Sequence, residues 1–370
     1  VKIGPSLIFE RLWKETGIRK AIKRLLANRR FEFDVERAIF LTVLHRLMVS
    51  ASDRFCERWR RDYRIEGTES LELHHLYRAM AFLGEALKDQ EGATPFALRC
   101  NKDLIEEMIF YDQRELLSEL KLVFFDTTSI YFEGRGGDTI GQKGFSKDHR
   151  PDLNQMVVGA IIDDQGKPIC CEMWPGNTTD VKTLIPIIDR ICKRFGIHNV
   201  CIVADRGMIS AKTIEELEEN NIAYILGIRM RRVNAIKNDV LSVGGRYRDV
   251  YQVHQTHGGQ EGVISKDPSP LKVKQVVLND KRYIVCLNPR QARKDAADRK
   301  AIIASLREQF KKGPKSLVGN KGYRRYLAID KHSARIDTDK IKYESRFDGK
   351  WVLTTNTNFS TEKVALKYKE

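Results

Sequence analysis

Residues 122–132 have the sequence Leu-Val-Phe-Phe-Asp-Thr-Thr-Ser-Ile-Tyr-Phe, in which one carboxylate, Asp126, interrupts a run of β-branched and aromatic side chains. Such a run predicts a β-strand. A second apolar stretch, Val-Cys-Ile-Val-Ala over residues 200–204, predicts another strand that ends directly at Asp205. Because a carboxylate among apolar side chains loses its hydration, a paired charge or a bound metal normally accompanies it. The two stretches therefore predict a sheet that carries a pair of functional aspartates.

The segments that surround these strands indicate an α/β sheet covered by helices. An apolar pair of strands around the turn at 163–166 predicts a hairpin, and helices are predicted over 180–195 and 210–220, followed by a strand over 223–228. In this order, an antiparallel hairpin sheet is extended by parallel crossovers. In α/β sheets, ligands bind at the carboxyl ends of such strands. Asp205 follows the carboxyl end of its strand, so it lies where a ligand is expected to bind.

Four parts follow from the changes in pattern along the chain. Residues 1–120 have apolar residues at helical spacing, with Asp34 as an N-cap and several exposed arginines (Arg58, Arg60, Arg61, Arg64), and we expect a helical region that binds DNA. Residues 121–228 form the first part of the core. Residues 229–348 alternate short strands around a basic helix near 292–312, which we interpret as a β-rich insertion outside the sheet. Residues 349–370 return to the core with a strand and the start of a helix.

The charge of the chain favours a polyanionic partner. With 65 Lys and Arg against 50 Asp and Glu, the 370 residues carry a net charge of +15. Fourteen basic residues against three acidic ones lie between Lys281 and Arg325, a density that favours a phosphate-binding surface over a solvated face. No run of 18 apolar residues and no basic-then-apolar leader is present, which argues against a membrane span or a secretory signal. The seven cysteines lie mostly inside apolar runs and form no C-x-x-C pair, which favours a reducing cytoplasm.

The pair of aspartates suits a hard divalent cation. Two carboxylates at one edge of a sheet are oxygen ligands of the kind that Mg²⁺ prefers. Two ions bridged by carboxylates activate a water or a 3′-hydroxyl and stabilise the leaving oxygen of a phosphodiester. If Asp126 and Asp205 share such a site, their carboxylates should approach within roughly 8 Å. The competing interpretation is structural, with Asp126 capping a turn and Asp205 capping a helix.

Four motifs together resemble the DDE, RNase H-like superfamily of bacterial insertion-sequence transposases, and within it the group with a β-rich insertion before the last acidic residue. The motifs are Leu122–Phe132 with its Asp126-Thr-Thr core, Gly144-Phe-Ser-Lys-Asp-His-Arg-Pro-Asp-Leu-Asn-Gln155, Pro175-Gly-Asn-Thr-Thr-Asp180 and Val203-Ala-Asp205-Arg-Gly207. The resemblance implies an RNase H-like core in which two Asp and one Glu hold two Mg²⁺ ions, with Mn²⁺ as a substitute. Asp126 and Asp205 are then the two catalytic, metal-binding aspartates.

The third carboxylate departs from this pattern. In the group it lies on the helix after the insertion, within a Tyr-x₂-Arg-x₃-Glu-x₆-Lys signature whose opening tyrosine matches Tyr368. The catalytic glutamate would then fall beyond Glu370, outside this chain. Glu344 and Glu362 are alternatives that fit the signature poorly, as does Glu370 itself. We therefore expect a transposase segment that lacks its last catalytic ligand.

The resemblance also implies the partners. They are double-stranded DNA, as terminal inverted repeats and target, and a second copy of the chain in a homodimer on DNA; the expected place is the bacterial cytoplasm, at the nucleoid when bound. The candidate DNA-binding residues are Lys147, Arg150, Arg206, Lys311, Lys312 and Lys315. For Lys147 and Arg206, a surface salt bridge is an equally good interpretation. A metal-dependent nuclease of the same fold and a DNA-binding remnant without catalysis are the competing functions.

Overall fold

Two compact units, Val1–Val200 and Cys201–Glu370, make up the computed structural model. The residues that it describes are 2–93, 97–113, 122–134, 136–146, 149–163, 165–179, 182–197, 200–254, 263–311, 325–329 and 334–369. Both units combine helices with β-strands, so the predicted α/β class is confirmed. Within these ranges, no helix is both long enough and apolar enough to cross a membrane.

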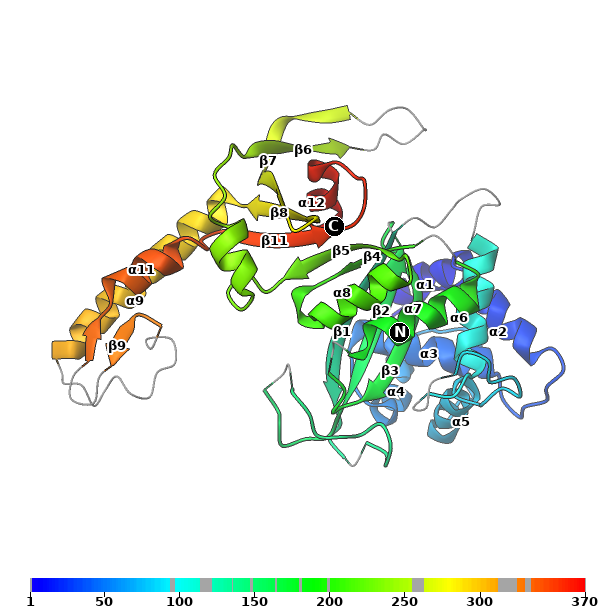
Figure 1. Cartoon of the computed structure of the whole chain (residues 1–370). Helices are drawn as coiled ribbons and strands as arrows, with labels where there is room; N and C mark the ends of the chain where they lie inside the picture. The colour runs from blue at the N-terminus through cyan, green and yellow to red at the C-terminus, as the bar shows by residue number, and fades with distance from the viewer. Residues whose placement is uncertain are drawn as a thin grey trace. The chain divides into compact units, whose positions relative to one another are not determined.

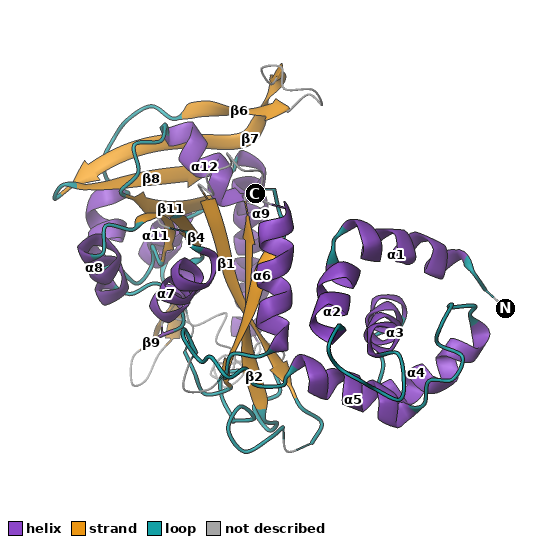
Figure 2. Cartoon of the chain, turned by 90° about the vertical axis from the view of Figure 1, so that its right-hand side faces the viewer, coloured by secondary structure: helices purple, strands orange, loops and turns teal. Residues whose placement is uncertain are grey.

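The first unit opens with helices. They are α1 (Gly4–Glu15), α2 (Ile18–Leu26), α3 (Val35–Met48), α4 (Asp53–Trp59), the short η1 (Arg60–Asp62), α5 (Leu73–Leu83) and α6 (Asn101–Gln113). Helix α3 lies at the centre of this group (Figure 2), and its Ala38, Leu41 and Leu44 are almost completely buried. Asp34 caps it as predicted, because its carboxylate accepts a hydrogen bond from the Arg37 N–H. Arg60 is not the exposed side chain expected, since its guanidinium donates to backbone carbonyls of residues 68–71.

Three antiparallel strands follow in the same unit. The order is β3-β2-β1, from β1 (Leu122–Tyr131), β2 (Gln155–Asp163) and β3 (Pro168–Pro175), and α7 (Leu184–Phe195) comes next. The predicted hairpin is thus confirmed, whereas Asp180, expected to start the helix, lies outside the described residues. Gly159 of β2 lies under the rings of Phe125 and Trp174, where a Cβ would come within 2.6 Å of Phe125. This close approach explains the glycine in an otherwise apolar strand.

The second unit contains a six-stranded run in the order β4-β5-β11-β8-β7-β6 (Figure 1). The strands are β4 (Cys201–Ala204), β5 (Ala223–Ile228), β6 (Arg248–His254), β7 (Val263–Leu278), β8 (Lys281–Leu287) and β11 (Lys350–Thr355). Strands β4 and β5 are parallel and joined through η3 (Arg206–Met208) and α8 (Ala211–Glu219), which Ser210 caps as predicted; the other pairs are antiparallel. The expectation that residues 229–348 stay outside the sheet is wrong, because β8 pairs with every residue of β11.

The rest of the second unit is built around two helices. The basic helix α9 (Pro289–Lys311) packs against β9 (Leu327–Ile329), β10 (Ala334–Ile336) and α11 (Thr338–Ser345) through a small core around Leu306. In Figure 1 it is the long helix that α11 accompanies. The other is α12 (Thr361–Lys369), whose Val364 and Ala365 are fully buried beside the sheet. A short helical turn, η4 (Ile236–Val240), precedes β6.

Candidate active site

Asp126 lies in the middle of β1, on the exposed face of the strand. Its neighbours Phe125 and Thr127 point into the core with 3% and 4% exposure, whereas Asp126 and Thr128 are exposed. The residue opposite Asp126 on β2 is Ala160, whose small side chain leaves the carboxylate open. One carboxylate oxygen, Oδ1, accepts the adjacent N–H of Thr127 at 2.8 Å. The structural alternative, a turn cap, is therefore wrong for Asp126.

Asp205 directly follows β4 and is also exposed. It occupies the N-cap position of η3, yet its side chain accepts no capping hydrogen bond. Its Oδ1 instead accepts a hydrogen bond of 2.7 Å from the hydroxyl of Tyr368 on α12. Helix capping therefore does not explain this carboxylate either. Burial, reinforced by the bond to Asp205, raises the pKa of the Tyr368 phenol far above its usual value, so the hydroxyl remains a donor.

Two further residues shape the backbone around Asp205. Gly227 of β5 lies so close to Tyr368 that a Cβ there would come within 2.3 Å of the phenolic oxygen and 3.0 Å of the Arg206 nitrogen. The guanidinium of Arg229 donates to the carbonyls of Arg206 and Gly207, at 3.1 and 2.9 Å. Sequence reasoning missed both residues, although a glycine inside an apolar strand is a recognised sign of close backbone approach.

The two carboxylates fit the ligand chemistry of Mg²⁺. Each is exposed, each has one oxygen oriented by a single donor, and neither has an ion-pair partner among the described residues. Oxygen donors of this kind suit a hard cation. The described part of the chain contains no group of three or more His, Cys, Asp or Glu side chains arranged to hold a metal. Asp126 belongs to the first unit and Asp205 to the second, and the expected approach of their carboxylates stays a prediction.

Comparison with known proteins identifies the family. The model of the transposase DDE domain family matches residues 118–370, which is more than half of the chain. The chain belongs to this DDE transposase family. No curated protein matches the chain. Among solved structures, "Mos1 transposase paired-end complex with left transposon end" is similar at 13% identity and a TM-score of 0.21, covering 50% of this chain and 57% of that one.

The other acidic residues considered for this DDE site already have partners. Glu344 on α11 lies 3.3 Å from the Arg231 Nε and 3.9 Å from an Arg325 nitrogen. Glu362, in the first turn of α12, lies 3.9 Å from Arg248. Glu370 lies outside the described residues. Within the described ranges, the hydroxyl of Tyr368 is the group of α12 that reaches Asp205.

The structure describes the side chains of only two of the predicted DNA-binding residues, Arg150 and Arg206. Arg150 is exposed, paired with Asp152 at 2.9 Å and placed over the Tyr131 ring. Arg206 is exposed and lines a charged pocket of about 310 Å³. Lys147, Lys312 and Lys315 lie outside the described residues, and for Lys311 only the backbone at the end of α9 is described.

Sequence reasoning overlooked a basic stripe on α9. Arg293, Lys300 and Arg307 are all exposed and follow one another at intervals of seven residues, which places them on one side of the helix over roughly 21 Å. On the other side, Leu306 is buried and Arg299 pairs with Asp348. Spacing alone could have revealed the stripe, because i and i+7 positions share a helix face.

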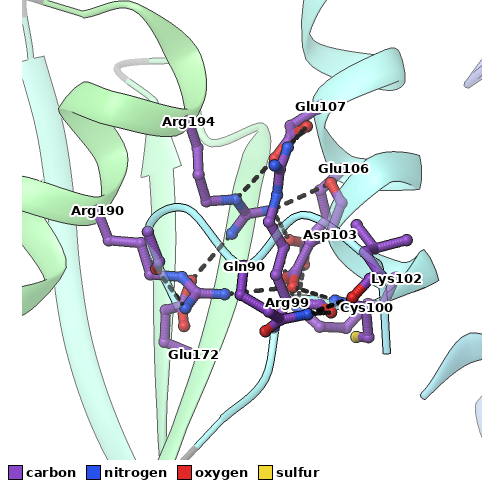
Figure 3. Close-up of polar contacts among 12 residues, drawn as sticks. Gln90, Arg99, Cys100, Lys102, Asp103, Glu106, Glu107, Glu172, Arg190 and Arg194 are labelled. Atoms are coloured by element: carbon purple, nitrogen blue, oxygen red, sulfur yellow. Dashed lines mark hydrogen bonds and ion pairs between the residues drawn. The ribbon is translucent and has the colours of Figure 1, made fainter. Parts of the chain in front are cut away.

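A buried charge network in the first unit provides a contrast to the exposed aspartates (Figure 3). Arg194 of α7 contacts Glu106 and Glu107 of α6 and Glu172 of β3, at 2.8 to 3.0 Å. Arg190 contacts Glu172 at 2.7 Å. Each of these carboxylates is occupied by a cation, so we assign the network to structure and not to catalysis. It also ties α6, expected in the N-terminal region, to the strands of the core.

Proposed function

We propose that this chain forms the catalytic part of a transposase that cleaves and joins DNA at the terminal inverted repeats of an insertion sequence. One observation carries the proposal. Within a transposase DDE domain, Asp126 and Asp205 are exposed carboxylates that the fold uses neither for capping nor, among the described residues, for ion pairs. Groups so placed are available for metal binding and catalysis.

In this proposal, the two aspartates, the metal ions and the groups that orient the aspartates have different roles. Asp126 and Asp205 would hold Mg²⁺, or Mn²⁺ in its place, and the two ions would supply Lewis acidity and an activated water or 3′-hydroxyl. The Thr127 N–H and the Tyr368 hydroxyl restrict the two carboxylates, which leaves one oxygen of each free for a cation.

DNA is the proposed partner because of the charge of the chain. The net charge is +15, and the basic stripe on α9 presents three cations in a row. Phosphate contacts of this kind supply affinity without sequence preference, and base contacts made elsewhere would read the repeats. We propose that the DNA complex contains two copies of the chain and forms in the cytoplasm, at the nucleoid. We also propose that the chain consists of the four parts predicted from the sequence, which end at residues 120, 228, 348 and 370.

Two competing functions are separable by experiment. A nuclease of the same fold would need neither the long segment between β5 and β11 nor its basic stripe, which favours the transposase. A DNA-binding remnant would bind the repeats and leave them intact. Gel-shift and cleavage assays on DNA with and without the element's ends, in Mg²⁺, distinguish the three functions.

The decisive variants are Asp126→Asn and Asp205→Asn. Both should retain binding to the element's ends and lose cleavage and strand transfer, because the amide removes a negative ligand of the cation. Cleavage is measured on DNA that carries the element's ends, in Mg²⁺. Asp280→Asn is the control, since Asp280 is exposed in the turn after β7, with a φ of 59° that Asn adopts readily. Cleavage that survives either core substitution would refute the proposed site.

A further inference from the structure

The hydroxyl of Tyr368 makes a contact that packing alone does not require. It donates to Oδ1 of Asp205 at 2.7 Å, across 163 residues of sequence. Asp205 itself is exposed, so water could satisfy its carboxylate without the phenol. Tyr368, in contrast, lies on the last turn of α12, a helix anchored by the fully buried Val364 and Ala365. The bond therefore joins an exposed carboxylate to a side chain that the packing of α12 holds in place.

The backbone is shaped to accept this phenol. Gly227 of β5 presents no side chain at the point where a Cβ would come within 2.3 Å of the phenolic oxygen and 3.1 Å of the ring carbon that bears it. The same Cβ would come within 3.0 Å of the Arg206 nitrogen. A larger residue at 227 would thus displace both the phenol and the turn that carries Asp205. Three elements, β5, α12 and the turn after β4, meet at one hydrogen bond.

We propose that Tyr368 is a positioning residue for metal binding: its hydroxyl fixes one oxygen of Asp205 and leaves the other to bind the cation. This inference rests on the proposed function, in which Asp205 is a metal ligand. Hydrogen bonds to a ligand carboxylate orient it before the metal arrives, and loss of such a partner typically weakens metal binding 10- to 100-fold. Tyr368 itself touches neither metal nor DNA in this proposal.

The chain supplies a matched control. Tyr224 of β5 also donates its hydroxyl to a carboxylate at 2.7 Å, that of Glu218 on α8. Tyr224 is 2% exposed and belongs to the same unit as Tyr368. Tyr224→Phe and Tyr368→Phe each remove one hydroxyl and one tyrosine–carboxylate bond. They differ in which carboxylate loses its donor.

The experiment measures Mn²⁺ binding to the whole chain by the electron paramagnetic resonance signal of the free ion, so it needs neither DNA nor cleavage. Tyr368→Phe should bind Mn²⁺ about 10-fold more weakly than the parent chain, and Tyr224→Phe should bind it equally well. Melting temperatures of the two variants, taken without metal, show whether their folds are equally intact. Asp205→Asn is included as the reference for loss of the ligand.

Each result decides a separate point. Weaker binding by Tyr368→Phe alone, with melting temperatures of the two tyrosine variants alike, supports the positioning role. If Asp205→Asn loses Mn²⁺ and Tyr368→Phe does not, the positioning role is wrong and the metal site stands. If Asp205→Asn binds Mn²⁺ as the parent does, the proposed site fails and the inference fails with it.

Discussion

Arg194 is the residue on which the buried network of the first unit depends most. Its guanidinium contacts four carboxylates, those of Asp103, Glu106, Glu107 and Glu172, while its own side chain is 2% exposed. Burial opposes the charge, yet Glu106 and Asp103 raise the pKa of Arg194, which therefore stays cationic. Arg194→Met should lower the free energy of unfolding by about 3–5 kcal/mol, because the four carboxylates are then left with three cations, Arg99, Lys102 and Arg190. Urea unfolding followed by circular dichroism measures this loss.

The neighbouring residue provides the control for that prediction. Lys193 forms an ion pair with Asp189 at 2.9 Å, but both side chains are more than half exposed. Lys193→Met should therefore leave the free energy of unfolding almost unchanged, because an exposed ion pair is screened by water and salt. Equal losses for the two variants would show that the network contributes no more than a surface pair does.

The sequence alone identified the two aspartates but neither the contact of Asp205 with Tyr368 nor the network around Arg194. Asp126 and Asp205 were identifiable because each interrupts or ends an apolar run, although both carboxylates are exposed and the burial cost expected from the sequence does not arise. The bond between Asp205 and Tyr368 was not, since it joins positions whose proximity only the packing of α12 creates. The network around Arg194 was hidden for the same reason, as its members come from α6, β3 and α7.

Helix α9 is the element whose role is open to the most direct test. Its basic stripe, Arg293, Lys300 and Arg307, is exposed, and we expect it to contact DNA phosphates. Each phosphate neutralised adds about 0.9 to the slope of log affinity against log salt, so replacing all three by Ala should flatten that slope by about 2–3. Binding should weaken about equally for all sequences, and preference for the terminal repeats should survive. Gel shifts at several salt concentrations give the slope.

A second triple variant tests the N-terminal helical part, which the sequence also predicts to bind DNA. Arg58, Arg61 and Arg64 are exposed arginines of the N-terminal helical part, and their replacement by Ala removes the same charge. If the salt slope falls with this variant and is unchanged when the stripe is lost, the DNA surface belongs to the helical region and α9 only faces solvent.

Elements were predictable where local pattern decides them. The hairpin of β2 and β3, strand β5 and the basic helix α9 follow from turn residues, apolar runs and helical spacing. The place of β8 in the sheet could not be predicted, because its partner β11 lies more than 60 residues further along the chain and no periodicity encodes that pairing. The error about residues 229–348 is thus one of topology and not of secondary structure.

At the scale of the molecule, the proposed site uses two ligands that lie far apart in the sequence, Asp126 on β1 and Asp205 directly after β4. A cation held by both aspartates would stabilise the native chain, since a ligand that binds only the native state adds about 2.7 kcal/mol at 100 times its Kd. Mg²⁺ should slow hydrogen exchange in β4 and β5, and Asp126→Asn should abolish that slowing as fully as Asp205→Asn does. Asp280→Asn should leave it intact. Persistent protection of β4 in Asp126→Asn would mean that Asp205 binds metal without Asp126, and the two-aspartate site would have to be abandoned.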